Sequence, residues 1–182
     1  MATYLITPQP GEYDPYYNRY ISLVSTTNIN QTLERQISDT RALLSGLTER
    51  EGDFCYAPNK WSTKQVLGHL IDSERIFAYR ALRVARGDRT PIEGFEQDDY
   101  VRNGPFVRSH LADLIEEFSA VRQSTVYFFR DLDVEAWTRR GVANNCEISV
   151  RALAYIVAGH ELHHRKILAE RYVGMMGKTV NG

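Results

Sequence analysis

Residues 159–165 read Gly159-His160-Glu161-Leu162-His163-His164-Arg165 and lie within a long run of helical periodicity. His160 and His164 are four residues apart, so on a helix they share one face, about 6 Å apart along the axis. The same stripe carries apolar residues, which direct both imidazoles toward the interior: Leu153, Val157, Ile167 and Leu168. Buried imidazoles without partners cost about 1–3 kcal/mol each. The pair therefore indicates a metal site or hydrogen-bonded core histidines, and the spacing favours the metal.

A third histidine, His69, lies in the second turn of another periodic run. Steps of three and four residues place it on one side of that predicted helix, beside apolar neighbours, so that it can point into the bundle. The residues on this side are Val66, Ser73, Ile76, Phe77 and Arg80. Taken alone, His69 fits a hydrogen-bonded core histidine equally well. Facing His160 and His164, it completes a three-imidazole site with one or more coordination positions open to water or substrate. Zinc, nickel and iron all accept such ligands.

The segment His160-Glu161-x-x-His164 also matches the short pattern of zinc peptidases, in which two histidines bind zinc and the glutamate activates water. One large peptidase group additionally requires glycine at position 167 and histidine at position 170, where this chain has Ile167 and Glu170. An all-helical body also offers no strand edge to hold an extended peptide. We therefore place a zinc peptidase behind the other interpretations.

Four long segments of 3.6-residue periodicity predict an all-α four-helix bundle with no sheet: 30–47, 63–86, 110–132 and 148–173. Ser62 and Gln65 form a capping box before the second segment, and Gly87 permits the left-handed turn that ends it. Gly174 is expected to end the fourth segment. In the third segment, Arg122 is expected to face outward.

The connecting segments carry turn signals rather than periodicity. Residues 1–29 contain several prolines among tyrosines and predict an irregular arm packed on the bundle. The link 88–108 could span the roughly 37 Å of a 25-residue helix, so the second and third helices can run in the same direction. We interpret its Asp98 and Asp99 as solvated. The link 137–147, with Asn144-Asn145 as a turn, is expected to be irregular.

The composition limits the class of protein. A length of 182 residues suits one domain covering 1–182, and a net charge of −1 with interspersed signs offers no basic surface for nucleic acid or an anionic membrane. Cys55 and Cys146 fit neither a disulfide framework nor a thiolate zinc site. The start of the chain lacks a leader-like pattern, and no stretch approaches 18 apolar residues. We therefore expect a cytoplasmic protein without membrane or nucleic-acid partners.

Several segments, taken in order, resemble the DinB-like superfamily, the group of YfiT-type metalloenzymes. The similarity covers nearly the whole chain and rests on an ordered set of motifs: Glu12-Tyr13-Asp14-Pro15-Tyr16-Tyr17-Asn18-Arg19-Tyr20, Lys60-Trp61-Ser62 through Gly68-His69-Leu70-Ile71-Asp72-Ser73-Glu74-Arg75, Ala85-Arg86-Gly87-Asp88 and Ala158-Gly159-His160-Glu161-Leu162-His163-His164.

The resemblance implies a four-helix bundle with up-down-down-up linkage and a metal site built from one histidine on the second helix and two on the fourth. These map to His69, His160 and His164, and the i, i+4 spacing favours His164 over its neighbour His163. The resemblance also implies a homodimer. Some members of the family are thiol S-transferases or thiol-dependent isomerases, which adds a low-molecular-weight thiol to the expected cofactors.

Two classes of function stay open. The first is a metal-dependent enzyme, a transferase or hydrolase acting on a small-molecule substrate, in which the ion lowers the pKa of a bound water or thiol. The second is a non-catalytic bundle that binds a metal or small molecule, or serves as an interaction module, with structural histidines. No carboxylate can be placed beside the three histidines from the sequence, so the catalytic residues stay unassigned.

Overall fold

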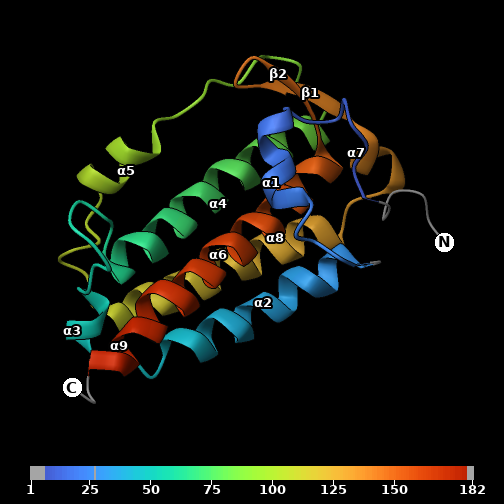
Figure 1. Ribbon diagram of the computed structural model, residues 1–182. Helices are drawn as coiled ribbons and strands as arrows, with labels where there is room; N and C mark the ends of the chain where they lie inside the picture. Colours follow the sequence, from blue (N-terminus) through green and yellow to red (C-terminus); the bar gives the residue numbers. More distant parts are fainter. Residues whose placement is uncertain (1–6, 27, 180–182) are drawn as a thin grey trace.

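The computed structural model describes residues 7–26 and 28–179, and within them four long helices form a bundle (Figure 1). These helices are α2 (Ile29–Leu44), α4 (Thr63–Ala85), α6 (Leu111–Arg130) and α8 (Val150–Ile167). Helices α4 and α6 begin at the same end of the bundle, whereas α2 and α8 run the opposite way (Figure 1). The expected all-α bundle with up-down-down-up linkage is confirmed, since the long link after α4 returns the chain to the end at which α4 began.

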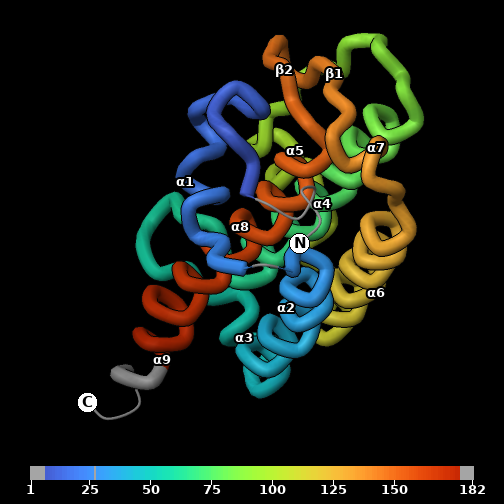
Figure 2. The backbone as a smooth tube through the Cα atoms, turned by 90° about the vertical axis from the view of Figure 1, so that its right-hand side faces the viewer, coloured from blue at the N-terminus to red at the C-terminus, as the bar shows by residue number. Residues whose placement is uncertain are grey.

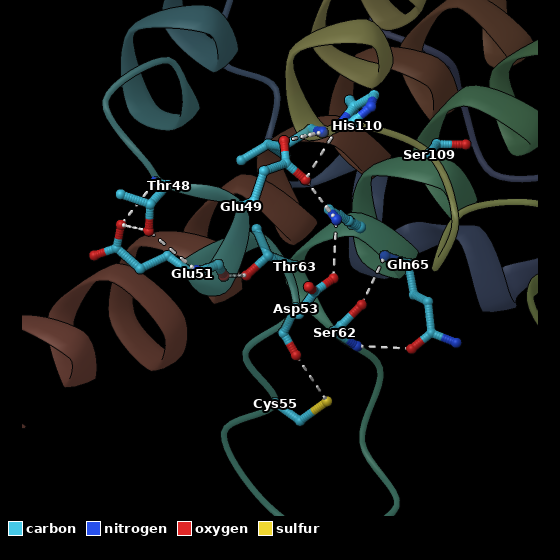
Figure 3. Close-up of polar contacts among 12 residues, drawn as sticks. Thr48, Glu49, Glu51, Asp53, Cys55, Ser62, Thr63, Gln65, Ser109 and His110 are labelled. Atoms are coloured by element: carbon cyan, nitrogen blue, oxygen red, sulfur yellow. Dashed lines mark hydrogen bonds and ion pairs between the residues drawn. The ribbon is translucent and has the colours of Figure 1, made fainter.

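The start of α4 is fixed by the predicted capping box (Figure 3). The Ser62 hydroxyl accepts from the backbone N–H of Gln65 at 3.2 Å, and the Gln65 side chain accepts from the backbone N–H of Ser62 at 2.9 Å. The buried ammonium group of Lys64 pairs with Glu49, on the short helix α3 (Glu49–Gly52), at 2.7 Å and with Asp53 at 2.9 Å. The end of α4 is equally regular, because Gly87 has a φ of 78°.

Buried polar side chains divide the apolar core into two parts along the bundle axis. One part lies toward the amino-terminal ends of α2 and α8 and contains Phe129, Trp137 and Leu153. The other lies toward their carboxyl-terminal ends and contains Leu67 and Phe118. The polar layer between them comes from all four long helices: Gln36, Thr40, His69, Ser73, Glu74, Arg122, Thr125, His160 and Glu161.

The expectation that Arg122 faces outward is wrong. Its side chain is 1% exposed and donates from Nε to Glu74 at 2.7 Å and from Nη1 to Gln36 at 2.5 Å. A paired arginine can occupy an interior position that hydrophobic periodicity alone assigns to the surface. Gln36 in turn donates to the carbonyl oxygen of Ala158 at 2.9 Å, so this network ties α4, α6 and α2 to α8.

The expectation of no sheet is wrong for residues 140–149. Strands β1 (Arg140–Ala143) and β2 (Cys146–Ser149) pair antiparallel, with Ala143 opposite Cys146. Asn144 and Asn145 between them have φ values of 52° and 62°, as a two-residue type I′ hairpin turn requires. Strands of four residues are too short to show a clear alternation, so only the turn is visible in the sequence.

The hairpin and the short helix α7 (Val134–Thr138) before it lie at the end of the bundle where α4 and α6 finish (Figures 1 and 2). The hairpin holds the first part of the long link, since Ile92 donates to the Val142 carbonyl at 3.0 Å and accepts from the Asn144 N–H at 2.8 Å. Beyond it the link contains α5 (Gln97–Asn103), a helix that the sequence pattern does not predict.

The amino-terminal arm packs on the bundle as expected, but it is partly helical. A 3₁₀ turn (Pro15–Tyr17) leads into α1 (Asn18–Ile21), which lies beside α8 (Figure 2). The buried carboxylate of Glu12 accepts from the Ser149 hydroxyl at 2.8 Å and pairs with Arg151 at the start of α8. Residues 1–6 and 27 of the expected arm lie outside the described residues.

The predicted end of the fourth helix at Gly174 is wrong. A π-helical turn (Leu168–Val173) follows α8 and continues into α9 (Gly174–Thr179), because Gly174 adopts the right-handed φ of −64°. The small and polar residues 177–182 predict a frayed tail; residues 177–179 belong to α9, and residues 180–182 lie outside the described residues. No helix in the described part of the chain is both long and apolar enough to cross a bilayer.

Candidate metal centre

Three histidines meet within the polar layer of the bundle. His69 comes from α4, and His160 and His164 come from α8. The Nε2 atoms of His69 and His160 are 3.0 Å apart, and one ring nitrogen from each of the three residues lies within 4.8 Å of the other two. Two imidazole nitrogens bound to one zinc ion, at about 2.1 Å each, stand roughly 3.4 Å apart in a tetrahedral site. The His69–His160 pair therefore lies close to the spacing that one ion requires, and the third ring nitrogen lies within 4.8 Å of both.

The environment keeps these imidazoles in the form that binds metals. Burial lowers the pKa of His69 to about 4 and that of His164 to about 3. Burial also holds the pKa of His160 well below its ordinary value, and the neighbouring imidazoles act in the same direction. A neutral imidazole offers the lone pair that a metal ion needs, so the trio is available to a cation at neutral pH without prior loss of protons.

Neighbouring side chains orient and cover the trio. The Ser73 hydroxyl lies 3.4 Å from Nδ1 of His69, one helical turn away, which leaves Nε2 of the same ring facing His160. The rings of Trp61 and Tyr20 lie 4.9 Å from His69 and 5.1 Å from His160, respectively. These aromatic walls shield the imidazoles from bulk water.

Glu161 faces a different part of the bundle. One carboxylate oxygen accepts from the Thr40 hydroxyl of α2 at 2.5 Å and lies 3.2 Å from Nε of Arg165. The other oxygen is buried without a hydrogen-bond partner among the described residues, and burial raises the pKa of this carboxyl. A glutamate held by α2 is not positioned to activate water beside the trio, which argues against the zinc-peptidase alternative.

The remaining polar candidates lie outside the trio. His163 is half-buried and is not part of the cluster of ligand nitrogens. Asp72 pairs with Arg75 at 3.5 Å rather than with a histidine of the trio. Asp98 is exposed, and Asp99 is exposed and pairs with Arg102, so neither joins the three histidines.

Two cavities give access to the trio. The first, of about 370 Å³, reaches His69 and His160, and the second, of about 320 Å³, reaches His164. The first lies between α4, the amino-terminal arm and the loop that the hairpin holds, and is lined by Asp14, Tyr16, Tyr17, Tyr20, Ser73, Phe77, Arg80, Gly94, Phe95, Glu96, Gln97 and Asn144. The second is lined by Tyr56, Asn59, Lys60, Trp61, Val66, Asp98, Ile167 and Tyr172.

Glycines directly before two of the histidines allow close packing around the trio. A Cβ atom on Gly159 would lie 2.1 Å from the carbonyl oxygen of Tyr20, and one on Gly68 would lie 2.3 Å from the ring of Phe106. Backbone therefore meets backbone where α1 crosses α8, and this approach brings the Tyr20 ring against His160.

We expect Gly159→Ala to lower the free energy of unfolding by about 1–3 kcal/mol, because α1 must move away from α8 to admit the methyl group. Thermal unfolding measures the change, which should appear as a loss of several degrees in Tm. Gly46→Ala is the matched control, since a Cβ atom there has nothing within 4 Å. Equal melting curves for the two variants would contradict the close contact at Gly159.

The fold and the site together define a class: a four-helix bundle whose interior gathers three uncharged histidines where a divalent cation can bind. The DinB superfamily matches residues 32–168, about three quarters of the sequence. The chain belongs to this superfamily, and the resemblance seen in its motifs is confirmed.

A solved structure shares the fold. YfiT from Bacillus subtilis, described as a probable metal-dependent hydrolase with an unusual four-helix bundle topology, is 16% identical, with a TM-score of 0.74 over 93% of each chain. At that identity the similarity establishes the architecture alone. A comparison with curated proteins finds no match.

Proposed function

We propose that this protein is a metal-dependent enzyme that acts on a small-molecule substrate at the three-histidine centre, as a hydrolase or a thiol S-transferase. The supporting observation is the trio itself: three ligand nitrogens within 4.8 Å of one another, from two buried histidines and the half-buried His164, reached by two cavities. Three protein ligands leave a coordination position open, which is typical of catalytic rather than structural sites. The fold shared with YfiT supports the proposal by analogy only.

When bound, a divalent cation would lower the pKa of a coordinated water or thiol, so that a nucleophile forms near neutral pH. The residues of the chain would bind the cation, orient its ligands and limit the access of water. His69, His160 and His164 would hold the cation, and Ser73 fixes the ring of His69. The rings of Tyr20 and Trp61 limit the access of water. Because the two cavities reach different members of the trio, a thiol and its acceptor could enter from separate sides.

A non-catalytic bundle with structural histidines is the second candidate. The 3.0 Å separation between Nε2 of His69 and Nε2 of His160 also fits a hydrogen bond between two neutral imidazoles. Under this alternative the trio would be a satisfied polar core. Zinc, nickel or iron is proposed as the metal because all three accept imidazole ligands. The low-molecular-weight thiol and the homodimer are proposed from the family resemblance.

The proposal is tested by metal analysis of protein purified without a histidine tag. We expect close to one equivalent of a divalent metal per chain after dialysis against zinc, nickel or ferrous iron at micromolar concentration. The loaded protein is then assayed for ester and amide hydrolysis and for transfer of low-molecular-weight thiols to electrophilic acceptors. Failure to retain any of the three metals would favour the structural-histidine alternative.

A further inference from the structure

Arg80 of α4 is buried in an unusual way. Only 2% of Arg80 is exposed, and its side chain is one of the largest among the fully buried side chains of the described residues. One terminal N–H group donates to the carbonyl oxygen of Glu93 at 2.9 Å, whereas the Nε atom is buried and has no hydrogen-bond partner among the described residues. The other two arginines of α4 pair with carboxylates, Arg75 with Glu117 and Arg83 with Asp88. No carboxylate in the described part of the chain pairs with Arg80.

A buried guanidinium without a counter-ion calls for an explanation. Arginine stays protonated in proteins, so burial does not neutralise it, and an unpaired buried charge is strongly unfavourable. The other deeply buried arginine, Arg122, illustrates the usual solution, because it is paired with Glu74 at 2.7 Å. Arg80 thus retains its charge and an Nε–H donor that the described residues leave unsatisfied.

Arg80, the residue that carries the unsatisfied donor, is one of the residues that line the cavity reaching the histidine trio. His69, Ser73, Phe77 and Arg80 all line this cavity, and they follow one face of α4. The Cα atoms of His69 and Arg80 are separated by about 16 Å along the axis, and long helical side chains lean back toward the amino terminus, which here means toward His69. The cavity therefore has a metal-ligating end and a cationic end.

Aromatic rings occupy the space near the cationic end. The centroids of Phe77 and Phe95 each lie 5.9 Å from Cζ of Arg80. A ligand that contacts both ends of the cavity must then pass an apolar section. This arrangement suits an elongated molecule with a polar reacting group, an apolar middle and a charged far end.

The other charged and titratable groups of the cavity restrict the charge of that ligand. Burial raises the pKa of Tyr17, although the charge of Arg80 and a hydrogen bond with its side chain oppose the shift, so the phenol is neutral. Asp14 accepts from the Cys146 thiol at 3.0 Å and from the backbone N–H of Tyr16, and Glu96 is exposed. These two carboxylates would repel a polyanion, so a single negative charge fits best.

We propose that Arg80 binds a carboxylate or a similar monoanionic group at the end of the substrate remote from the reacting atom. The enzyme would then select small organic acids over their neutral analogues. This inference rests on the proposed function, because it assumes that the same cavity serves the metal centre.

The test uses a probe that can contact both ends of the cavity. Octanedioic acid monohydroxamate carries a metal-chelating hydroxamate and a free carboxylate, and its methyl ester replaces the carboxylate by an uncharged ester group. Calorimetry on the zinc-loaded protein should show that the acid binds about ten- to a hundredfold more tightly than the ester. Arg80→Gln should abolish this preference and leave the affinity for the ester unchanged, whereas Arg80→Lys should retain part of it.

Arg75→Gln is the matched control, since Arg75 lies on the same helix with a half-exposed side chain. It should keep the full preference for the acid. Equal binding of acid and ester by the unaltered protein, or an undiminished preference in Arg80→Gln, would overturn the inference while the metal centre stands.

A second readout needs no metal, and it uses a variant only to assign one resonance. The Nε–H resonance of Arg80, assigned by its absence from Arg80→Lys, should shift when the acid is added to metal-free protein at millimolar concentration and stay in place with the ester. If the protein fails to retain zinc, the proposed function fails, and this resonance alone decides the role of Arg80. A resonance that does not respond to the acid would overturn the inference.

Discussion

Alanine at position 69, 160 or 164 is expected to lower the affinity for zinc by more than about a hundredfold. Each replacement of His69, His160 or His164 removes one of three metal–nitrogen bonds, and even groups that only orient a ligand typically change affinity ten- to a hundredfold. The three losses should be similar, because each residue supplies one ligand nitrogen to the same cluster. Metal occupancy is measured by elemental analysis at equal protein concentration, together with Tm to confirm folding.

Two neighbours on α8 serve as controls. His163→Ala should retain the metal, because His163 lies outside the cluster of ligand nitrogens. Glu161→Gln should retain it as well, since the Glu161 carboxylate is bound to Thr40 and Arg165. Full occupancy in His69→Ala alongside loss in the two α8 variants would show that the third ligand lies elsewhere, as a peptidase-like site would require.

Much of this architecture can be predicted from the sequence because its signals are local. Helices α2, α4 and α6 begin and end within three residues of the limits that periodicity and caps predict. The capping box at Ser62 and the positive φ of Gly87 are both observed. The i, i+4 spacing of His160 and His164 indicates a shared site, and the helical face of His69, together with the family motifs, indicates His69 as the third member.

The rest depends on contacts between segments far apart in the chain. Asn144 lines the first cavity because the β1–β2 hairpin binds the loop after α4 through Ile92. No periodicity in the sequence indicates this contact between the hairpin and the loop. Tyr20 reaches His160 because Gly159 lacks a side chain, a fact that becomes informative only once α1 is known to cross α8. Sequence patterns also treat every arginine alike, so Arg122 is placed outward although Glu74 holds it inside.

Replacing Arg122 in the polar layer that contains the histidines is expected to cause a large loss of stability. Arg122→Met should lower the free energy of unfolding by about 3–5 kcal/mol, because it leaves the Glu74 carboxylate buried without its counter-ion. The variant also removes the hydrogen bond from Arg122 to Gln36, whose amide donates to the Ala158 carbonyl two residues before His160. The loss should therefore extend to the part of α8 that positions the trio.

Denaturant unfolding and Tm measure this change, and a loss of roughly 10 °C in Tm corresponds to the expected energy. Arg130→Met is the matched control on the same helix, because Arg130 and Asp131 form an exposed pair worth less than about 1 kcal/mol. The double variant Arg122→Met/Glu74→Leu should recover most of the lost stability, since an apolar pair of similar volume can replace a buried ion pair. If the double variant proves no more stable than Arg122→Met alone, the cost does not come from the uncompensated charge of Glu74. Packing around α6 would then be the origin of the loss.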